Sequence, residues 1–146
     1  MGSICGQMYQ NDTISSCYSK VNIFSSTNQY EHDVGGLCGF SGIGANDNNL
    51  IINCYNTGNI RVENTGNSAQ VGGIVARCNG SDSNVITNCY STGEIFSTRG
   101  DDKNIACYAG GICAYYGRVE NCFTAIEGNG IINNMNTSIG RSLLST

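Results

Sequence analysis

The sequence predicts an all-β fold, a parallel β-solenoid (β-helix-like) of about four repeats of roughly 35 residues each. Two observations predict it. The first is internal repetition, since the glycine pairs that begin at Gly35, Gly72 and Gly110 are 37 and then 38 residues apart. The second is a series of short apolar runs rich in Ile, Val and Tyr, separated by clusters of Gly, Asn, Asp and Ser. No stretch has the spacing of an amphipathic helix, so we expect little helix.

Each repeat contains two motifs in a fixed order. A Gly-Gly motif, as at 34–38, precedes an Asn-Cys-Tyr motif that begins at Asn53 and Asn88, with weaker copies at Ser16 and Asn121. The whole chain is expected to form one repeat domain, residues 1–146. Its predicted parts are four units near 4–24, 34–62, 71–97 and 109–128, and a C-terminal cap or tail at 129–146.

Each unit contains three candidate strands, which in the second unit are 36–40, 50–55 and 59–63. So small a unit cannot bury its apolar side alone, so we expect the units to stack about 4.8 Å apart, with equivalent side chains in ladders. The predicted ladders are Ile14, Ile51, Ile86 and Val119; Cys17, Cys54, Cys89 and Cys122; Ile23, Ile60 and Ile95; and Asn53, Asn88 and Asn121. The asparagines mark a bend that lets Ile51 and Cys54 point inward together, because Asn tolerates left-handed backbone.

The combination of Gly-Gly-Leu-Cys-Gly at 35–39 with Asn-Cys-Tyr-Asn-Thr-Gly at 53–58 resembles the GLUG repeat family. That family occurs in bacterial surface proteins, adhesins and some IgA1-specific metallopeptidases, so the resemblance implies a β-solenoid stalk. It covers the second and third units well and the other two in part. The family's repeat contains no catalytic residues, so the resemblance implies none for this chain. The sequence also lacks the His-Glu-x-x-His zinc motif.

The nine cysteines allow two interpretations. Assigning one pair to each unit leaves Cys107 over. Four disulfides would suit an exported protein, whereas free thiols would suit a stacked core in which Cys packs as a small hydrophobe. Val75 occupies the position that Cys38 holds one unit earlier, which indicates a site that requires only an apolar group. We therefore expect mostly buried, reduced thiols, and no zinc site, since there is no C-x-x-C pair.

The composition and the loop sequences exclude several classes of function. A net charge of -4 gives no basic surface for nucleic acid, and no apolar run is long enough for a membrane span. We expect equivalent positions such as Asn56 and Ser91 to point outward, and no carboxylate pair recurs at such positions, so we expect no enzyme; a glycan-active β-helix enzyme is an alternative. The loop 46–49 and Asp82 carry oxygen ligands suited to Ca²⁺, but their spacing matches no calcium motif. We expect solvated turns, a solvated His32 and no cofactor.

These features predict a non-catalytic repeat segment of a bacterial surface or secreted protein, acting as a stalk or adhesion scaffold. It would lie outside the cell or at its surface as part of a longer exported protein, with a host surface protein or glycan as its partner. Arg99, Gly100 and Asp101 form a candidate adhesion loop, because Arg-Gly-Asp is an integrin-recognition sequence. The alternative is a self-assembling subunit that stacks end to end into a filament.

Overall fold

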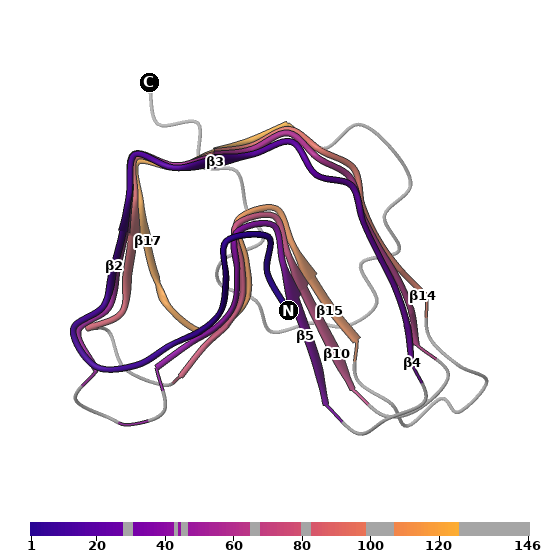
Figure 1. The fold of residues 1–146 in the computed structure, drawn as a ribbon, viewed down its shortest axis with the longest axis horizontal. Helices are drawn as coiled ribbons and strands as arrows, with labels where there is room; N and C mark the ends of the chain where they lie inside the picture. Colours follow the sequence, from indigo (N-terminus) through magenta and orange to yellow (C-terminus); the bar gives the residue numbers. More distant parts are fainter. Residues whose placement is uncertain are drawn as a thin grey trace.

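The computed structural model describes residues 1–27, 31–42, 44, 47–64, 68–79, 83–98 and 107–125. These residues form an all-β parallel solenoid in which four rungs stack on one another (Figure 1). The predicted fold class is confirmed. The described part of the chain contains no helix, and so none that could span a membrane.

The strands lie in five sheets, and each sheet collects equivalent strands of successive rungs. Sheet A contains β5 (His32–Gly35), β10 (Ala69–Gly72) and β15 (Cys107–Gly110). Sheet B contains β1 (Cys5–Met8), β6 (Cys38–Ser41), β11 (Val75–Cys78) and β16 (Cys113–Tyr115). Sheet C contains β2 (Thr13–Ser15), β7 (Leu50–Ile52), β12 (Val85–Thr87) and β17 (Arg118–Glu120). Sheet D contains β3 (Tyr18–Ser19), β8 (Tyr55–Asn56), β13 (Tyr90–Ser91) and β18 (Phe123–Thr124), and sheet E contains β4 (Ile23–Thr27), β9 (Ile60–Asn64) and β14 (Ile95–Thr98).

The middle rungs therefore have five short strands each, where the sequence predicts three. The strand expected at 50–55 divides into β7 and β8, because the backbone at Asn53 is left-handed, with a φ of 55°. Asn88, Asn121 and, in the first rung, Ser16 have the same conformation. This corner resets the alternation of side chains, so Ile51 and Cys54 both enter the core. The strands of sheet A are not predicted: they end at the first glycine of each pair, whereas the first predicted strand of a unit begins at the second glycine, as at 36–40.

The rungs stack in register. Ile51 pairs with Ile14 on one side and Ile86 on the other, and Ile86 pairs in turn with Val119. Ile60 lies in the same way between Ile23 and Ile95. Equivalent positions thus form ladders along the stack, over four rungs in sheets B, C and D and over three described rungs in sheets A and E.

Two apolar cores fill each rung. The first contains residues of sheets B and C and of the Gly-Gly turns: Met8, Ile14, Leu37, Cys38, Ile51, Cys54, Ile74, Val75, Cys78, Ile86, Cys89, Ile112 and Cys113. The second lies between sheets A and E: Ile23, Val34, Ile60, Val62, Ala69, Val71 and Ile95. Sheets A and B belong to different cores and diverge from the Gly-Gly turn at the centre of the rung (Figure 1).

The two sequence motifs meet at this turn. The second glycine of each pair packs against the residue that follows the aromatic residue of the Asn-Cys-Tyr motif, in the pairs Gly36 with Asn56, Gly73 with Ser91, and Gly111 with Thr124. Asn56 and Ser91 are buried. The expectation that they point outward is wrong, because the left-handed residue three positions earlier shifts the alternation by one.

Candidate functional site

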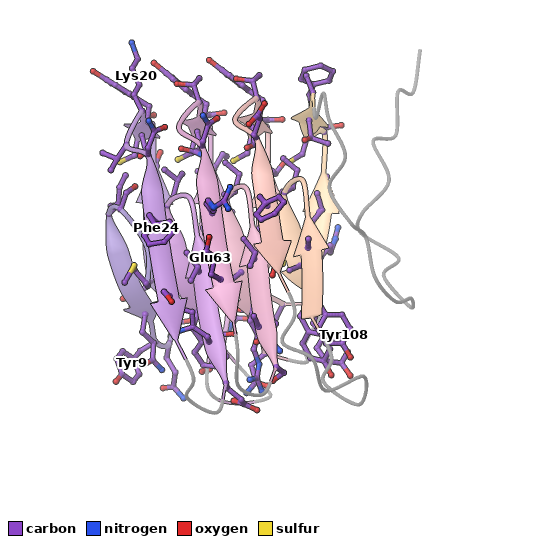
Figure 2. The ribbon with its side chains drawn as sticks, turned by 90° about the vertical axis from the view of Figure 1, so that its right-hand side faces the viewer. Tyr9, Lys20, Phe24, Glu63 and Tyr108 are labelled. Atoms are coloured by element: carbon purple, nitrogen blue, oxygen red, sulfur yellow. The ribbon has the colours of Figure 1, made fainter. Side chains whose placement is uncertain are left out.

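Outward side chains form rows across the rungs, because every rung keeps the same register. One row is aromatic: the rings of Tyr18 and Tyr55 stack with centroids 5.0 Å apart, those of Tyr55 and Tyr90 stack 4.8 Å apart, and Phe123 is the next residue in register. Lys20 projects from the same edge of the solenoid (Figure 2), with its ammonium 5.6 Å from the Tyr18 ring. The stacked ring faces cover one another, so this row exposes mainly ring edges and tyrosine hydroxyl groups to solvent.

A second row lies on sheet E. Phe24, Arg61 and Phe96 are in register, and the Arg61 guanidinium lies 4.6 Å from the Phe96 ring. Arg61 also pairs with Glu63 at 2.9 Å. Phe24 and Glu63 point away from the sheet toward solvent in Figure 2.

The third row lines a groove, which is the candidate site. It lies between the outer faces of sheets A and B, where a cavity of about 220 Å³ is lined by Glu31, Ser68, Gln70, Arg77, Tyr108 and Tyr115. Three successive rungs contribute these residues. We call this cavity the A/B groove. The sequence gives no signal for it, because it depends on the angle between two sheets of which one was not predicted.

Arg77 is the central cation of the A/B groove. Its guanidinium lies 5.2 Å from the Phe40 ring and 5.7 Å from the Tyr115 ring, and its Nη1 donates to Glu31 Oε2 at 2.9 Å. The ring of Tyr108 contacts that of Tyr115 at 5.2 Å from the opposite sheet. Stacked on rings and paired with a carboxylate, Arg77 is held in one orientation.

Burial shifts the pKa values of two titratable side chains of β5, Asp33 and His32. Burial raises the pKa of Asp33 to about 6; Glu31 adds to the shift and Arg77 opposes it. Asp33 lies in register with Gln70 of the A/B groove. His32 is part of a strand and not a solvated loop residue, which corrects the sequence-based expectation. Its Nε2 lies 2.6 Å from Ser25 Oγ, and burial lowers its pKa.

Asp33 is expected to destabilise the folded state at neutral pH. Between about pH 4 and 6 the folded protein retains a proton on Asp33 that the unfolded chain has lost, so the contribution to the free energy of unfolding falls as pH rises. For this partly exposed carboxyl we expect Asp33→Asn to stabilise the protein by about 1 kcal/mol at pH 7 and hardly at pH 4. Urea unfolding of both proteins at several pH values measures this difference. If the free energies of unfolding of the two proteins differed by the same amount at every pH, the prediction would be wrong.

The cysteines lie in ladders between rungs. The Cys54 Sγ accepts from the backbone N–H of Cys17 at 3.4 Å, and the Cys122 Sγ does so from Cys89 at 3.4 Å. A second ladder places Cys5, Cys38, Val75 and Cys113 in register, so Cys and Val are equivalent there. The eight described cysteines are free thiols: Cys5, Cys17, Cys38, Cys54, Cys78, Cys89, Cys113 and Cys122.

We expect two classes of thiol reactivity at pH 8. The partly exposed thiols of Cys5, Cys17 and Cys122 should be alkylated in the native protein. The five buried thiols should react only after denaturation, because the fold keeps the reagent from their sulfur atoms. Burial also raises the pKa of Cys38 to about 12, whereas the hydrogen bond with Cys89 lowers the pKa of Cys54 to about 6, so for Cys54 the access of the reagent alone decides. Peptide mapping by mass spectrometry after differential alkylation measures both classes. Disulfide-linked peptides within a unit, such as Cys38 with Cys54, would contradict the thiol assignment.

The asparagines occupy two kinds of ladder. At the left-handed corner, Asn88 Nδ2 donates to Asn53 Oδ1 at 3.3 Å, and Asn121 has the same backbone conformation. A second ladder, which the sequence analysis missed, precedes sheet C. There Asn49 Oδ1 accepts from the N–H of Asp12 at 2.9 Å, and Asn84 Oδ1 accepts from the N–H of Asn49 at 3.2 Å. Its signal was present, since an Asp or Asn stands directly before each of the first three strands of sheet C.

Two described residues of the loop considered for Ca²⁺ are buried and hydrogen-bonded within the solenoid. Asp47 and Asn49 are buried, so the expectation of a solvated turn is wrong for them. Asp47 Oδ2 accepts from the N–H of Gly44 at 2.6 Å, and its backbone carbonyl accepts from Ser83 Oγ at 2.7 Å. Among the residues that the structure describes, no three His, Cys, Asp or Glu side chains cluster around a common point.

Several predicted features lie outside the described residues: Asn46, Asp82, the Arg99–Asp101 tripeptide and the tail at 129–146. The side chain of Cys107 is also outside them. No protein-family model matches this chain, and neither a curated protein nor a solved structure gives a significant match.

Proposed function

We propose that this chain is a non-catalytic scaffold segment of an exported surface protein, in which stacked rungs present rows of side chains for adhesion. The observation that carries the proposal is the shared register of the four rungs. It links every rung to the next through parallel backbone hydrogen bonds and repeats each outward position at about 4.8 Å. Such a stack is stiff and displays an extended surface, as repeat scaffolds do. The GLUG-like motifs support the same proposal.

The location is tested with antibodies against the described surface. On intact cells of the source organism we expect labelling equal to that on permeabilised cells, and protease added outside should remove it. Labelling that requires permeabilisation would overturn the proposal. An unrelated cytosolic protein, labelled in parallel, controls for leaky cells.

A second candidate, the filament subunit, has its own supporting observation. Most of the exposed large apolar side chains lie in the first rung: Met1, Ile4, Tyr9, Tyr18, Val21 and Phe24. Strands β1 to β4 are also the edge strands of their sheets in the described structure, and edge strands are templates for further pairing. Light scattering over a concentration series separates the candidates: constant mass supports the scaffold, and mass that grows with concentration supports the filament.

A further inference from the structure

We infer that the A/B groove binds one neutral, hydroxyl-rich sugar ring of a glycan, with Gln70 and Arg77 as its polar contacts and Tyr108 and Tyr115 as its apolar ones. The inference rests on the proposed adhesive scaffold and names the class of its partner. It draws on four features of the groove: its size, a buried amide oxygen without a partner, a fixed guanidinium and a balanced charge.

The size of the groove suits one sugar ring. Its volume of about 220 Å³ is below the range of about 300–1,000 Å³ typical of drug-sized ligands. Tyr108 from β15 and Tyr115 from β16 form an aromatic corner on one side. Aromatic rings pack well against the C–H face of a pyranose, because both surfaces are apolar and flat.

Gln70 supplies a polar group that the protein leaves unused. It is only 5% exposed, yet its Oε1 has no hydrogen-bond partner within the described part of the chain. A buried amide oxygen normally has one, and leaving it unpaired costs free energy. Gln70 lines the cavity. The oxygen is shielded in this conformation, and a rotation of the side chain toward the groove would let a ligand hydroxyl group donate to it and remove the cost.

Arg77 supplies the complementary donor. Its Nη1 is engaged by Glu31, but its Nε is buried without an acceptor among the described residues. The two flanking rings fix the plane of the guanidinium. Sugar hydroxyls both donate and accept hydrogen bonds, so one ring can satisfy the Gln70 oxygen and the Arg77 nitrogen together.

The charge of the groove favours a neutral ligand. Arg77 and Glu31 form an ion pair at 2.9 Å and cancel, and Asp33 lies next to Gln70 in the same sheet and adds a negative charge when ionised. No uncompensated cation of the described residues lines the cavity. Uronate or sulfate groups would therefore meet no excess positive charge.

The inference is tested by titrating the protein with cellohexaose, mannohexaose and N-acetylchitohexaose, and with an oligogalacturonate of equal length, by calorimetry or ligand-observed NMR. We expect at least one neutral hexasaccharide to bind with a Kd below about 1 mM. Gln70→Leu and Arg77→Met should each weaken it at least tenfold. Arg61→Met is the matched control, because Arg61 also lies on an aromatic ring and pairs with a glutamate, but on sheet E.

Three results would overturn the inference: no binding of any neutral probe, binding of the oligogalacturonate alone, or equal loss in the Arg61→Met control. Circular dichroism verifies that each variant is folded, and Gln70→Leu guards against loss of fold, since it replaces a side chain whose amide oxygen is unpaired with an apolar group of similar size. Failure of binding with normal surface labelling and constant mass refutes only the groove inference. Failure of surface labelling refutes the scaffold itself.

Discussion

Gly73→Ala is expected to prevent stable folding or to lower the free energy of unfolding by about 3 kcal/mol or more. The added Cβ would lie 1.9 Å from the carbonyl oxygen of Gly111 in the next rung and 2.5 Å from Ser91 Oγ. The Gly111 carbonyl belongs to the backbone of a hydrogen-bonded stack and cannot rotate away as a side chain could, so the steric clash is relieved only if the two rungs separate. Urea unfolding followed by circular dichroism measures the loss.

Gly6→Ala is the matched control for this prediction. Gly6 lies in the short strand β1, and nothing lies within 4 Å of its ideal Cβ position. Alanine there should leave the unfolding midpoint unchanged or raise it slightly, since glycine weakens a strand. An equal midpoint for both variants would show that the Gly-Gly turn is not the tight contact described above.

Ile86→Ala is expected to cost about 2–5 kcal/mol. Ile86 is 1% exposed and lies between Ile51 and Val119, so truncation leaves a cavity with a rung on each side. Ile14, in the same ladder, is 8% exposed and has a described neighbour on one side only. Ile14→Ala should therefore cost clearly less. Thermal and urea unfolding of both variants measure this gradient, and an equal or reversed order would contradict the stacking argument.

The ladders were predictable because the sequence repeats at nearly constant spacing. Equivalent positions of stacked repeats must lie above one another, which places Ile14, Ile51 and Ile86 in one row before any coordinates are known. The left-handed conformation of Asn53 also followed, because Ile51 and Cys54 are three residues apart and both apolar. These inferences need only local geometry and the repeat itself.

The A/B groove was not predictable in the same way. It exists because sheets A and B diverge from the Gly-Gly turn, whose second glycine packs against Asn56 in one rung and against Ser91 in the next. Those two residues were expected on the surface, since polar residues usually are. Asn56 is instead buried with both ends of its amide bonded to the backbone of Gly58, at 2.9 and 3.2 Å. A polar side chain that is buried by bonding the turn after its own strand gives no signal in a hydrophobicity pattern.

The shared register of the rungs has a mechanical consequence. The backbone hydrogen bonds that join rungs point along the stack, so a pull along that axis acts on the rung interfaces in series, and they separate one after another. The same pull applied across the stack would load many interfaces at once, in shear. A scaffold of this kind that is held at both ends would thus unfold in steps. Each step would release the length of one repeat and dissipate part of the mechanical work, while the remaining rungs stay folded.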